Sequence, residues 1–410
     1  MKTYACIIIG GGAAGLTAAV TLGHALPQGD VLLLEKLPRV GKKLLSTGNG
    51  TCNLTNMHAD ATHYHGDTAL AKTVLARFTP TDTMAFFDSL GVTATVREDG
   101  KVYPRAEQAA AVLDCLRLEI AARGVEIRTD CAVTKIEKQH NIFTLQTDNQ
   151  TVYAKTVLCC TGGAAAPALG GDVEGYALLT NLGHTRTPLF PAIVQLRTDT
   201  TFVRAMKGLR VDAAVTLRSD TATRREVGEV LFTDYGISGP AVMQLSRIAG
   251  DWERQKKGNC MLTLDLFPDQ SEQQLTALLR ARTALSPRTL EDFFTGLLHK
   301  RIGQTVIRAA GLSLTAPTTA LTARDIAALA KLVKGWTFSV TGTQGFGGAQ
   351  VTAGGINTHE FDTHLESALC QNLFAAGELL NVDGDCGGYN LQFAFASAHT
   401  AAMRILEKLS

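Results

Sequence analysis

The sequence predicts an α/β protein in which a doubly wound domain is interrupted by a different, inserted domain. Three observations support this prediction. Strands over 4–9 and 30–34 surround a helix over 13–25, so strand and helix patterns alternate at the start of the chain. From about residue 188 the pattern changes to short β-type runs, followed by a mainly helical stretch over 270–333. After residue 334 the chain returns to strands and glycines, as expected if both ends build one domain.

The composition is that of a folded protein with two or three domains. The chain has 410 residues, and 45% of them are hydrophobic. Lys and Arg total 39 against 38 Asp and Glu, which argues against binding nucleic acid or an anionic membrane through bulk charge. Residues 5–22 are largely apolar but are interrupted by three glycines, and no other apolar run reaches the roughly 18 residues of a membrane span. Nine Cys without CxxC spacing argue against a zinc site and indicate reduced thiols, so we expect a cytoplasmic protein without a metal.

The remaining elements follow from local patterns. Residues 36–67 are polar and rich in Gly, Asn and Thr, which predicts a long loop. Later in the first part we expect helices over 69–78, 81–90 and 106–122, a hairpin over 93–103 around Asp99-Gly100, and short strands between 125 and 160. In the insertion we expect strands over 193–196, 211–217, 229–232 and 261–264, a helix near 239–249, and later helices over 272–281, 290–299, 306–310 and 323–332.

A glycine cluster directly follows the first strand. Gly10, Gly12 and Gly15 form a GxGxxG pattern around Ala13-Ala14 and open the first helix. In such a turn the first glycine permits a tight bend, the second lets the backbone approach a pyrophosphate, and the third lets helix and strand pack closely. The helix N-terminus offers unpaired N–H groups to the phosphates. The context predicts a Rossmann-like dinucleotide-binding domain.

Glu35 ends the second strand, 20 residues after Gly15. Its carboxylate is suited to accept hydrogen bonds from a ribose diol, and its negative charge repels a 2′-phosphate. The sequence therefore predicts a nucleotide with an unmodified adenosine ribose, which leaves FAD and NAD as alternatives.

Longer motifs indicate which nucleotide is bound. The segments 41–56 (GKKLLSTGNGTCNLTN), 231–240 (LFTDYGISGP), 350–355 (QVTAGG) and 376–392 (AGELLNVDGDCGGYNLQ) resemble an FAD-dependent oxidoreductase family that includes aminoacetone oxidases and BaiN-type bile-acid 3-dehydro-Δ4 reductases. The resemblance covers nearly the whole chain. Thr51, Asn381 and Asp385 depart from the usual Arg, Asp and Pro of that family, which weakens the transfer of any one member's substrate.

The resemblance implies non-covalent FAD and a fold in four segments. The pattern changes along the chain agree with this fold and place the FAD-binding domain at 1–188 and 334–410, an inserted β-rich domain at 189–268, and a small helical subdomain at 269–333. The resemblance also implies three groups of cofactor contacts besides the first glycine turn. They are the loop with Lys36, Lys42, Lys43, Thr47, Gly48, Asn49 and Asn53, the turn Thr161-Gly162-Gly163, and the C-terminal Gly377, Glu378, Gly387, Gly388, Tyr389 and Asn390.

The resemblance leaves more than one activity open. The leading expectation is hydride transfer from NAD(P)H through flavin N5 to a C=C bond conjugated to a carbonyl, in a small-molecule substrate. A flavin amine oxidase that passes electrons to O2 is the alternative, and an FAD-binding RNA-associated protein is a third that the near-neutral charge disfavours. No catalytic residue is assigned, although Tyr103, Tyr235, Tyr389 and His184 are possible proton donors. The sequence does not indicate an oligomeric state.

Overall fold

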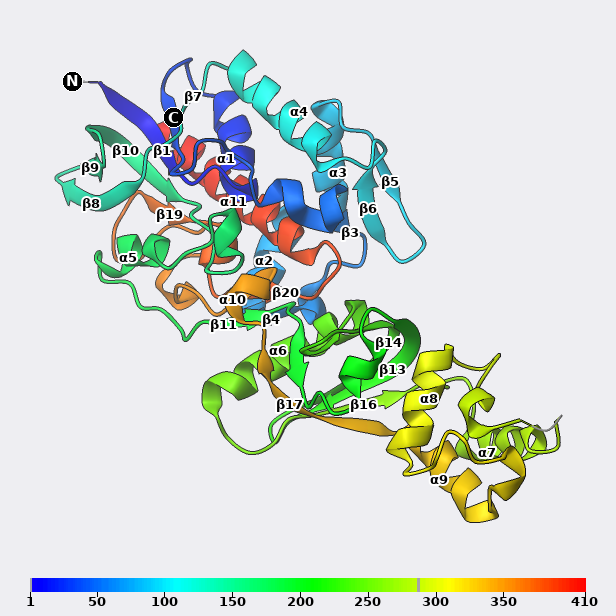
Figure 1. Ribbon diagram of the computed structural model, residues 1–410. Coiled ribbons are helices and arrows are strands. Elements are labelled where there is room, and N and C mark those ends of the chain that lie inside the picture. Colours follow the sequence, from blue (N-terminus) through cyan, green and yellow to red (C-terminus); the bar gives the residue numbers. More distant parts are fainter. Residues whose placement is uncertain (1, 286–287) are drawn as a thin grey trace. The chain divides into compact units, whose positions relative to one another are not determined.

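A computed structural model describes residues 2–285 and 288–410. The chain divides into two compact units (Figure 1), unit 1 with residues up to 190 together with 350–410, and unit 2 with residues 191–349. Residues 334–349, expected in the returning part of the FAD-binding domain, instead belong to unit 2. The reason is β17 (Trp336–Thr343), which alternates buried and exposed side chains and pairs with two other strands of unit 2.

Unit 1 is built on an open sheet of seven strands in the order β7-β2-β1-β10-β9-β8, with β19 also paired to β10. Five of these strands are parallel: β1 (Thr3–Ile9), β2 (Val31–Leu34), β7 (Glu126–Arg128), β10 (Thr151–Cys159) and β19 (Leu373–Ala375). The antiparallel strands β8 (Val133–Gln139) and β9 (Ile142–Thr147) extend one edge. The chain runs from β1 to β2 on one side, while β10 pairs with β1 on the other. The carboxyl ends of β1 and β10 therefore form the kind of switch point where α/β sheets bind ligands.

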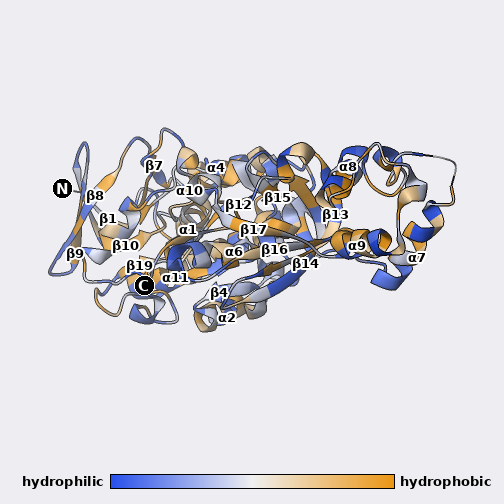
Figure 2. Ribbon diagram, turned by 60° about the horizontal axis from the view of Figure 1, so that its bottom comes forward, coloured by the Kyte–Doolittle hydropathy of each residue, from blue (hydrophilic) through white to orange (hydrophobic). Residues whose placement is uncertain are grey.

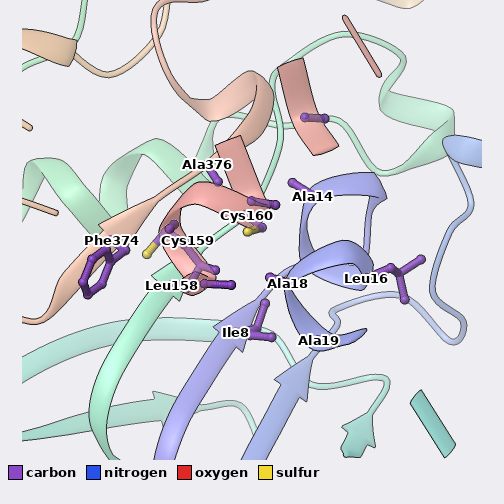
Figure 3. Packing of buried hydrophobic residues seen from close by; sticks show 14 of the residues in the cluster. Ile8, Ala14, Leu16, Ala18, Ala19, Leu158, Cys159, Cys160, Phe374 and Ala376 are labelled. Carbon is purple, nitrogen blue, oxygen red and sulfur yellow. The ribbon is translucent and has the colours of Figure 1, made fainter. Parts of the chain in front are cut away.

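Two helices pack closely beside this sheet. α1 (Ala13–Gly23) is almost wholly buried, and α11 (Tyr389–Leu409) packs along it. The small side chains Ala18 and Ala19 of α1 are both fully buried. Figure 3 shows the shared core, with side chains from β1, β10, α1 and β19. Cys159 and Cys160 lie in this core and have exposed fractions of 0% and 5%, so both thiols are packing groups here.

The rest of unit 1 surrounds this core. The helices are α2 (Thr68–Arg77), α3 (Pro80–Ser89), α4 (Ala109–Ala122) and α5 (Glu174–Thr180). The expected hairpin around Asp99-Gly100 is confirmed as β5 (Ala94–Val96) and β6 (Lys101–Pro104), with β3 (Thr55–Asn56) on the other side of β6. The expected loop over 36–67 contains more structure than predicted, including β3, β4 (Tyr64–Gly66) and the 3-10 turn η1 (Leu44–Gly50). β4 pairs with β20 (Val382–Gly384) from the far end of the chain.

Unit 2 contains a closed barrel in the order β12-β15-β14-β13-β16-β17. The strands are β12 (Leu196–Thr198), β13 (Arg210–Arg218), β14 (Thr223–Phe232), β15 (Gly236–Ser238), β16 (Met261–Asp265) and β17. α6 (Pro240–Gln255) packs on the barrel strands, and α7 (Glu272–Arg282), α8 (Lys300–Ala309) and α9 (Ala323–Lys334) form the helical part. In α8 and α9, hydrophobic residues lie on the buried side and hydrophilic residues on the other (Figure 2). The short segments β11 (Phe190–Ala192), α10 (Gly345–Gly348) and β18 (Val351–Ala353) lie where the chain passes between the units.

The described residues form neither a membrane-spanning helix nor a metal-binding cluster. None of the helices formed by residues 2–285 and 288–410 is long and apolar enough to cross a membrane. The same residues contain no cluster of three or more His, Cys, Asp or Glu side chains that could hold a metal ion.

The packing of α1 on β1 leads to a first prediction. A Cβ atom at Gly15 would lie 1.9 Å from the carbonyl oxygen of Gly10. Gly15→Ala should therefore lower the free energy of unfolding by about 1–3 kcal/mol or more, the range for overpacked cores. Gly347→Ala is the control, since a Cβ there has no heavy atom within 4 Å. Urea denaturation measures both, and equal stability of the two variants would contradict the packing described here.

Candidate functional site

The three glycines of the first turn differ in what the fold requires of them. Gly10 has φ +103°, and a Cβ there would lie 2.4 Å from the carbonyl oxygen of Cys160 at the end of β10. A side chain at position 15 is excluded by the carbonyl oxygen of Gly10, as described above. A Cβ at Gly12 would have no heavy atom within 4 Å. The protein's own packing therefore explains Gly10 and Gly15, whereas Gly12 presents open backbone to whatever occupies the turn.

Glu35 ties the end of β2 to this turn. Its side chain is buried, and Oε2 accepts a hydrogen bond of 2.7 Å from the backbone N–H of Gly11. Oε1 accepts another, of 2.9 Å, from the backbone N–H of Leu37. A carboxylate oxygen has two lone pairs, so each oxygen keeps one for a further donor such as a ribose hydroxyl.

These groups line one cleft with about 890 Å³ of space that is partly open to solvent. Its walls come from the carboxyl ends of β1, β2 and β10, the loop after β2 and the turn before α5. The sequence-predicted residues in this lining are Gly10, Gly12, Glu35, Lys36, Lys42, Lys43, Thr161, Gly162 and Gly163. Ala13, Ala14 and Gly15 continue directly from the turn into α1.

The four cations along the loop after β2 are not equivalent. Lys36 forms an ion pair with Asp172, and Lys43 Nζ lies 2.7 Å from Glu378 Oε2. Within residues 2–285 and 288–410, Lys42 and Arg39 form no ion pair, and both line the cleft. They are the cations best placed to meet an anionic ligand. The sequence analysis did not name Arg39. Its position four residues after Glu35, in the loop that leaves the end of β2, is the signal that could have placed it in this cleft.

Glu378 supports the turn after β10 through hydrogen bonds that run by way of Thr352. Its Oε1 accepts a 2.8 Å hydrogen bond from the backbone N–H of Thr352, while Oε2 binds Lys43. The Thr352 hydroxyl accepts a hydrogen bond from the backbone N–H of Ala165. A Cβ at Gly163 would lie 2.5 Å from that hydroxyl oxygen, so only glycine fits there. The structure thus brings Glu378 to the turn through Thr352, a residue that the sequence reasoning did not single out.

Gly377 has φ +74°, and its N–H donates to the Ser397 hydroxyl over 2.9 Å. A Cβ at Gly377 would lie 3.1 Å from the Cβ of Ala14, so this glycine lies beside the start of α1.

The predicted residues from Thr47 to Asn53 and from Gly387 to Asn390 form a second group that does not line this cleft. Gly48 and Asn49 both adopt left-handed backbone, while the Thr47 hydroxyl donates to the Leu44 carbonyl. Asn53 is buried, and its Oδ1 has no hydrogen-bond partner among the described residues. That oxygen would lie 2.9 Å from a Cβ at Gly388, so the two segments meet at the start of α11.

The start of α11 is shaped by its own side chains. Gly387 and Gly388 have φ of 131° and 101°. The Asn390 amide spans the preceding turn, because Oδ1 accepts from the Gly384 N–H and Nδ2 donates to the Gly384 carbonyl, both over 2.8 Å. The Tyr389 ring stacks on His63 with centroids 4.5 Å apart, and burial raises the pKa of Tyr389 to about 12.

Two of the possible proton donors lie in other surroundings. His184 is bound by Glu360 and Ser367, at 2.9 Å on either side of its ring, and burial lowers its pKa. It does not line the cleft, so its partners indicate a structural role. Tyr235 belongs to unit 2.

A parallel sheet with a glycine turn, a buried acid after the second strand and unpaired cations at its switch point defines a dinucleotide-binding protein of the Rossmann class. Residues 4–404 match the family described as HI0933-like protein Rossmann domain, and the chain belongs to that family. It is a flavin-dependent oxidoreductase, and its cofactor is FAD.

Two curated relatives match along their whole length. The chain is 36% identical over 405 residues to the 3-dehydro-bile acid delta(4,6)-reductase of Clostridium scindens, covering 98% of both chains. It is 28% identical to the ribosomal RNA dihydrouridine synthase of Escherichia coli, covering 99% of both. The second is the more distant of the two.

Solved structures of low sequence identity share the fold. A 3-ketosteroid delta1-dehydrogenase from Sterolibacterium denitrificans matches with a TM-score of 0.53 and 11% identity, covering all of both chains. The FrdA subunit of E. coli quinol fumarate reductase matches with a TM-score of 0.52 and 17% identity, covering all of this chain and 71% of that one.

The residues present fit FAD. The open backbone at Gly12 suits a pyrophosphate, and the cations of Lys42 and Arg39 suit its charge. The hydroxyl of Thr161, in the cleft wall, is a buried polar atom without a partner in the described chain, as is the Asn53 oxygen. Such groups are rare in folded proteins, and a bound polar ligand is one explanation for them.

Gly12 offers a sharp test of the cleft. Gly12→Val should leave the fold intact, because the side chain enters open space, but should abolish FAD binding by occupying the pyrophosphate position. The measurements are bound flavin absorbance after reconstitution and far-UV circular dichroism. A folded variant with full FAD occupancy would show that this turn is not the phosphate site.

Proposed function

We propose that this protein reduces a C=C bond conjugated to a carbonyl in a small-molecule substrate, with NAD(P)H as the electron donor. The observation that supports this most is the 36% identity to a bile-acid reductase along 98% of both chains. When bound, FAD supplies hydride transfer, accepting the hydride from one substrate and giving it to the other. The protein's part is to hold the cofactor in place and to tune its surroundings.

Individual residues have distinct parts in this proposal. Glu35 holds the ribose diol, while Arg39 and Lys42 neutralise the pyrophosphate. Lys43 and Glu378 neutralise one another and brace the turn after β10. The N–H groups at the start of α11 favour negative charge on the pyrimidine edge of the flavin, which helps the cofactor to accept electrons.

A second candidate is reduction of a uracil base in RNA. The C=C bond of uracil is also conjugated to a carbonyl, and two relatives at 28% identity carry the name ribosomal RNA dihydrouridine synthase. One observation on this chain favours it. Residues 191–349 contain 20 Lys and Arg but 14 Asp and Glu, so unit 2 is basic although the chain as a whole is nearly neutral. Charge asymmetry of this kind is typical of proteins that contact polyanions.

Anaerobic stopped-flow measurements separate the candidates. We expect NADH or NADPH to bleach the flavin absorbance, and a steroid-like 3-oxo-4-ene or 4,6-diene to restore it. In parallel arms, the reduced protein is mixed with unmodified ribosomal RNA or with air, and the oxidised protein with amines. Rapid reoxidation by RNA alone would favour the second candidate. Reduction by an amine, but not by either nicotinamide, would contradict the proposal and indicate an amine oxidase.

A further inference from the structure

A buried amide lies in the first turn of α11. Gln392 is fully buried, and its Oε1 accepts hydrogen bonds from the hydroxyls of Thr55 (2.6 Å) and Thr83 (2.7 Å). Its Nε2 donates to the Phe78 carbonyl over 2.9 Å. Burying a primary amide costs free energy unless its groups are bonded. Here one side chain joins α11 to β3, to α3 and to Phe78 at the end of α2.

The bond to Thr55 matters because the same segment touches the start of α11 by its backbone. A Cβ at Gly388 would lie 2.6 Å from the carbonyl oxygen of Thr55, so the two backbones approach closely. One residue later, Asn56 Nδ2 donates to the Gly387 carbonyl over 3.1 Å. Segment 53–56 is thus held to the start of α11 by two hydrogen bonds, of which the bond to Gln392 is the more buried.

We propose that Gln392 is a positioning residue for the flavin. Its hydrogen bonds fix segment 53–56, and with it the unpartnered amide oxygen of Asn53, against the N-terminus of α11. These two groups then meet the pyrimidine edge of the isoalloxazine together. This inference rests on the proposed function, because it requires FAD at that place. Gln392 itself is fully enclosed and acts only through Thr55 and the helix.

Two variants separate the effect of the Gln392 amide on the stability of the fold from its effect on the position of segment 53–56. Gln392→Leu alone leaves the hydroxyls of Thr55 and Thr83 buried without their acceptor, which destabilises the fold. Adding Thr55→Val and Thr83→Val replaces those hydroxyls by methyl groups of the same shape, so that of the groups bonded to Gln392 only the Phe78 carbonyl is left without its partner. Apolar contacts are non-directional, however, so the triple variant regains packing without regaining the fixed register.

The experiment compares the parent, Gln392→Leu and the triple variant, each reconstituted with FAD. Three quantities are measured: the thermal midpoint, the dissociation constant for FAD and the reduction potential of the bound flavin. We expect both variants to bind FAD about tenfold more weakly, the scale of one buried hydrogen bond, and to show a shifted potential. We expect the triple variant to regain most of the thermal midpoint that Gln392→Leu loses, with the unpaired Phe78 carbonyl accounting for the remainder. If Gln392→Leu fails to fold, the triple variant carries the test.

Thr156→Val is the matched control, since its buried hydroxyl donates to the Ala5 carbonyl in the sheet of the same unit. It should lose stability without a change in potential. A triple variant that regains both the midpoint and the potential would overturn the positioning role, as would a Gln392→Leu variant with unchanged affinity and potential. A parent protein that binds no FAD would instead overturn the proposed function, and the inference with it.

Discussion

The contact between Glu35 and the backbone N–H of Gly11 is the constraint on which the cofactor cleft depends. It joins the end of β2 to the turn after β1, while the close approach of Gly10 to Cys160 joins that turn to the end of β10. Three neighbouring strands therefore end at fixed positions around one point. The loop with Arg39 and Lys42 starts from the same place, because Glu35 also accepts a hydrogen bond from Leu37. Replacing Gly10 or Gly11 by a larger residue would therefore separate the strand ends and open the cleft.

Much of this arrangement was predictable from local sequence patterns. The glycine spacing, the acid after the second strand and the Asp99-Gly100 hairpin each depend on conformations that few residues adopt, so short motifs identify them. The limit of unit 2 was misplaced by about fifteen residues, because β17 follows a helical stretch and finds its partners, β12 and β16, far away along the chain. The role of Thr352 behind the turn after β10 was missed for the same reason, since its partners Ala165 and Glu378 lie far from it in sequence.

The candidate site separates into two groups with different physical characters. The first group lines the cleft and consists of cations and open glycine backbone. Its geometry follows from the parallel sheet itself. The second group lies at the start of α11 and is held by side-chain hydrogen bonds of Asn390, Asn56 and Gln392. The parallel sheet sets the geometry of the first group, whereas hydrogen bonds of Asn56 and Gln392 to partners more than 300 residues away in sequence set the geometry of the second. Under the proposed function, the surroundings of the flavin ring therefore depend on tertiary contacts that no local motif encodes.

The most direct test of this account measures which half of the cofactor the cleft around Glu35 recognises. After FAD is removed, the protein is titrated with FAD, FMN, ADP and ADP bearing a 2′-phosphate, and binding is followed by calorimetry. We expect FAD to bind and ADP to compete with it, and we expect FMN and the 2′-phosphorylated nucleotide not to bind, because Glu35 accepts a free ribose diol and repels a phosphate. FMN binding as tightly as FAD, or equal affinity for the two adenine nucleotides, would contradict this account.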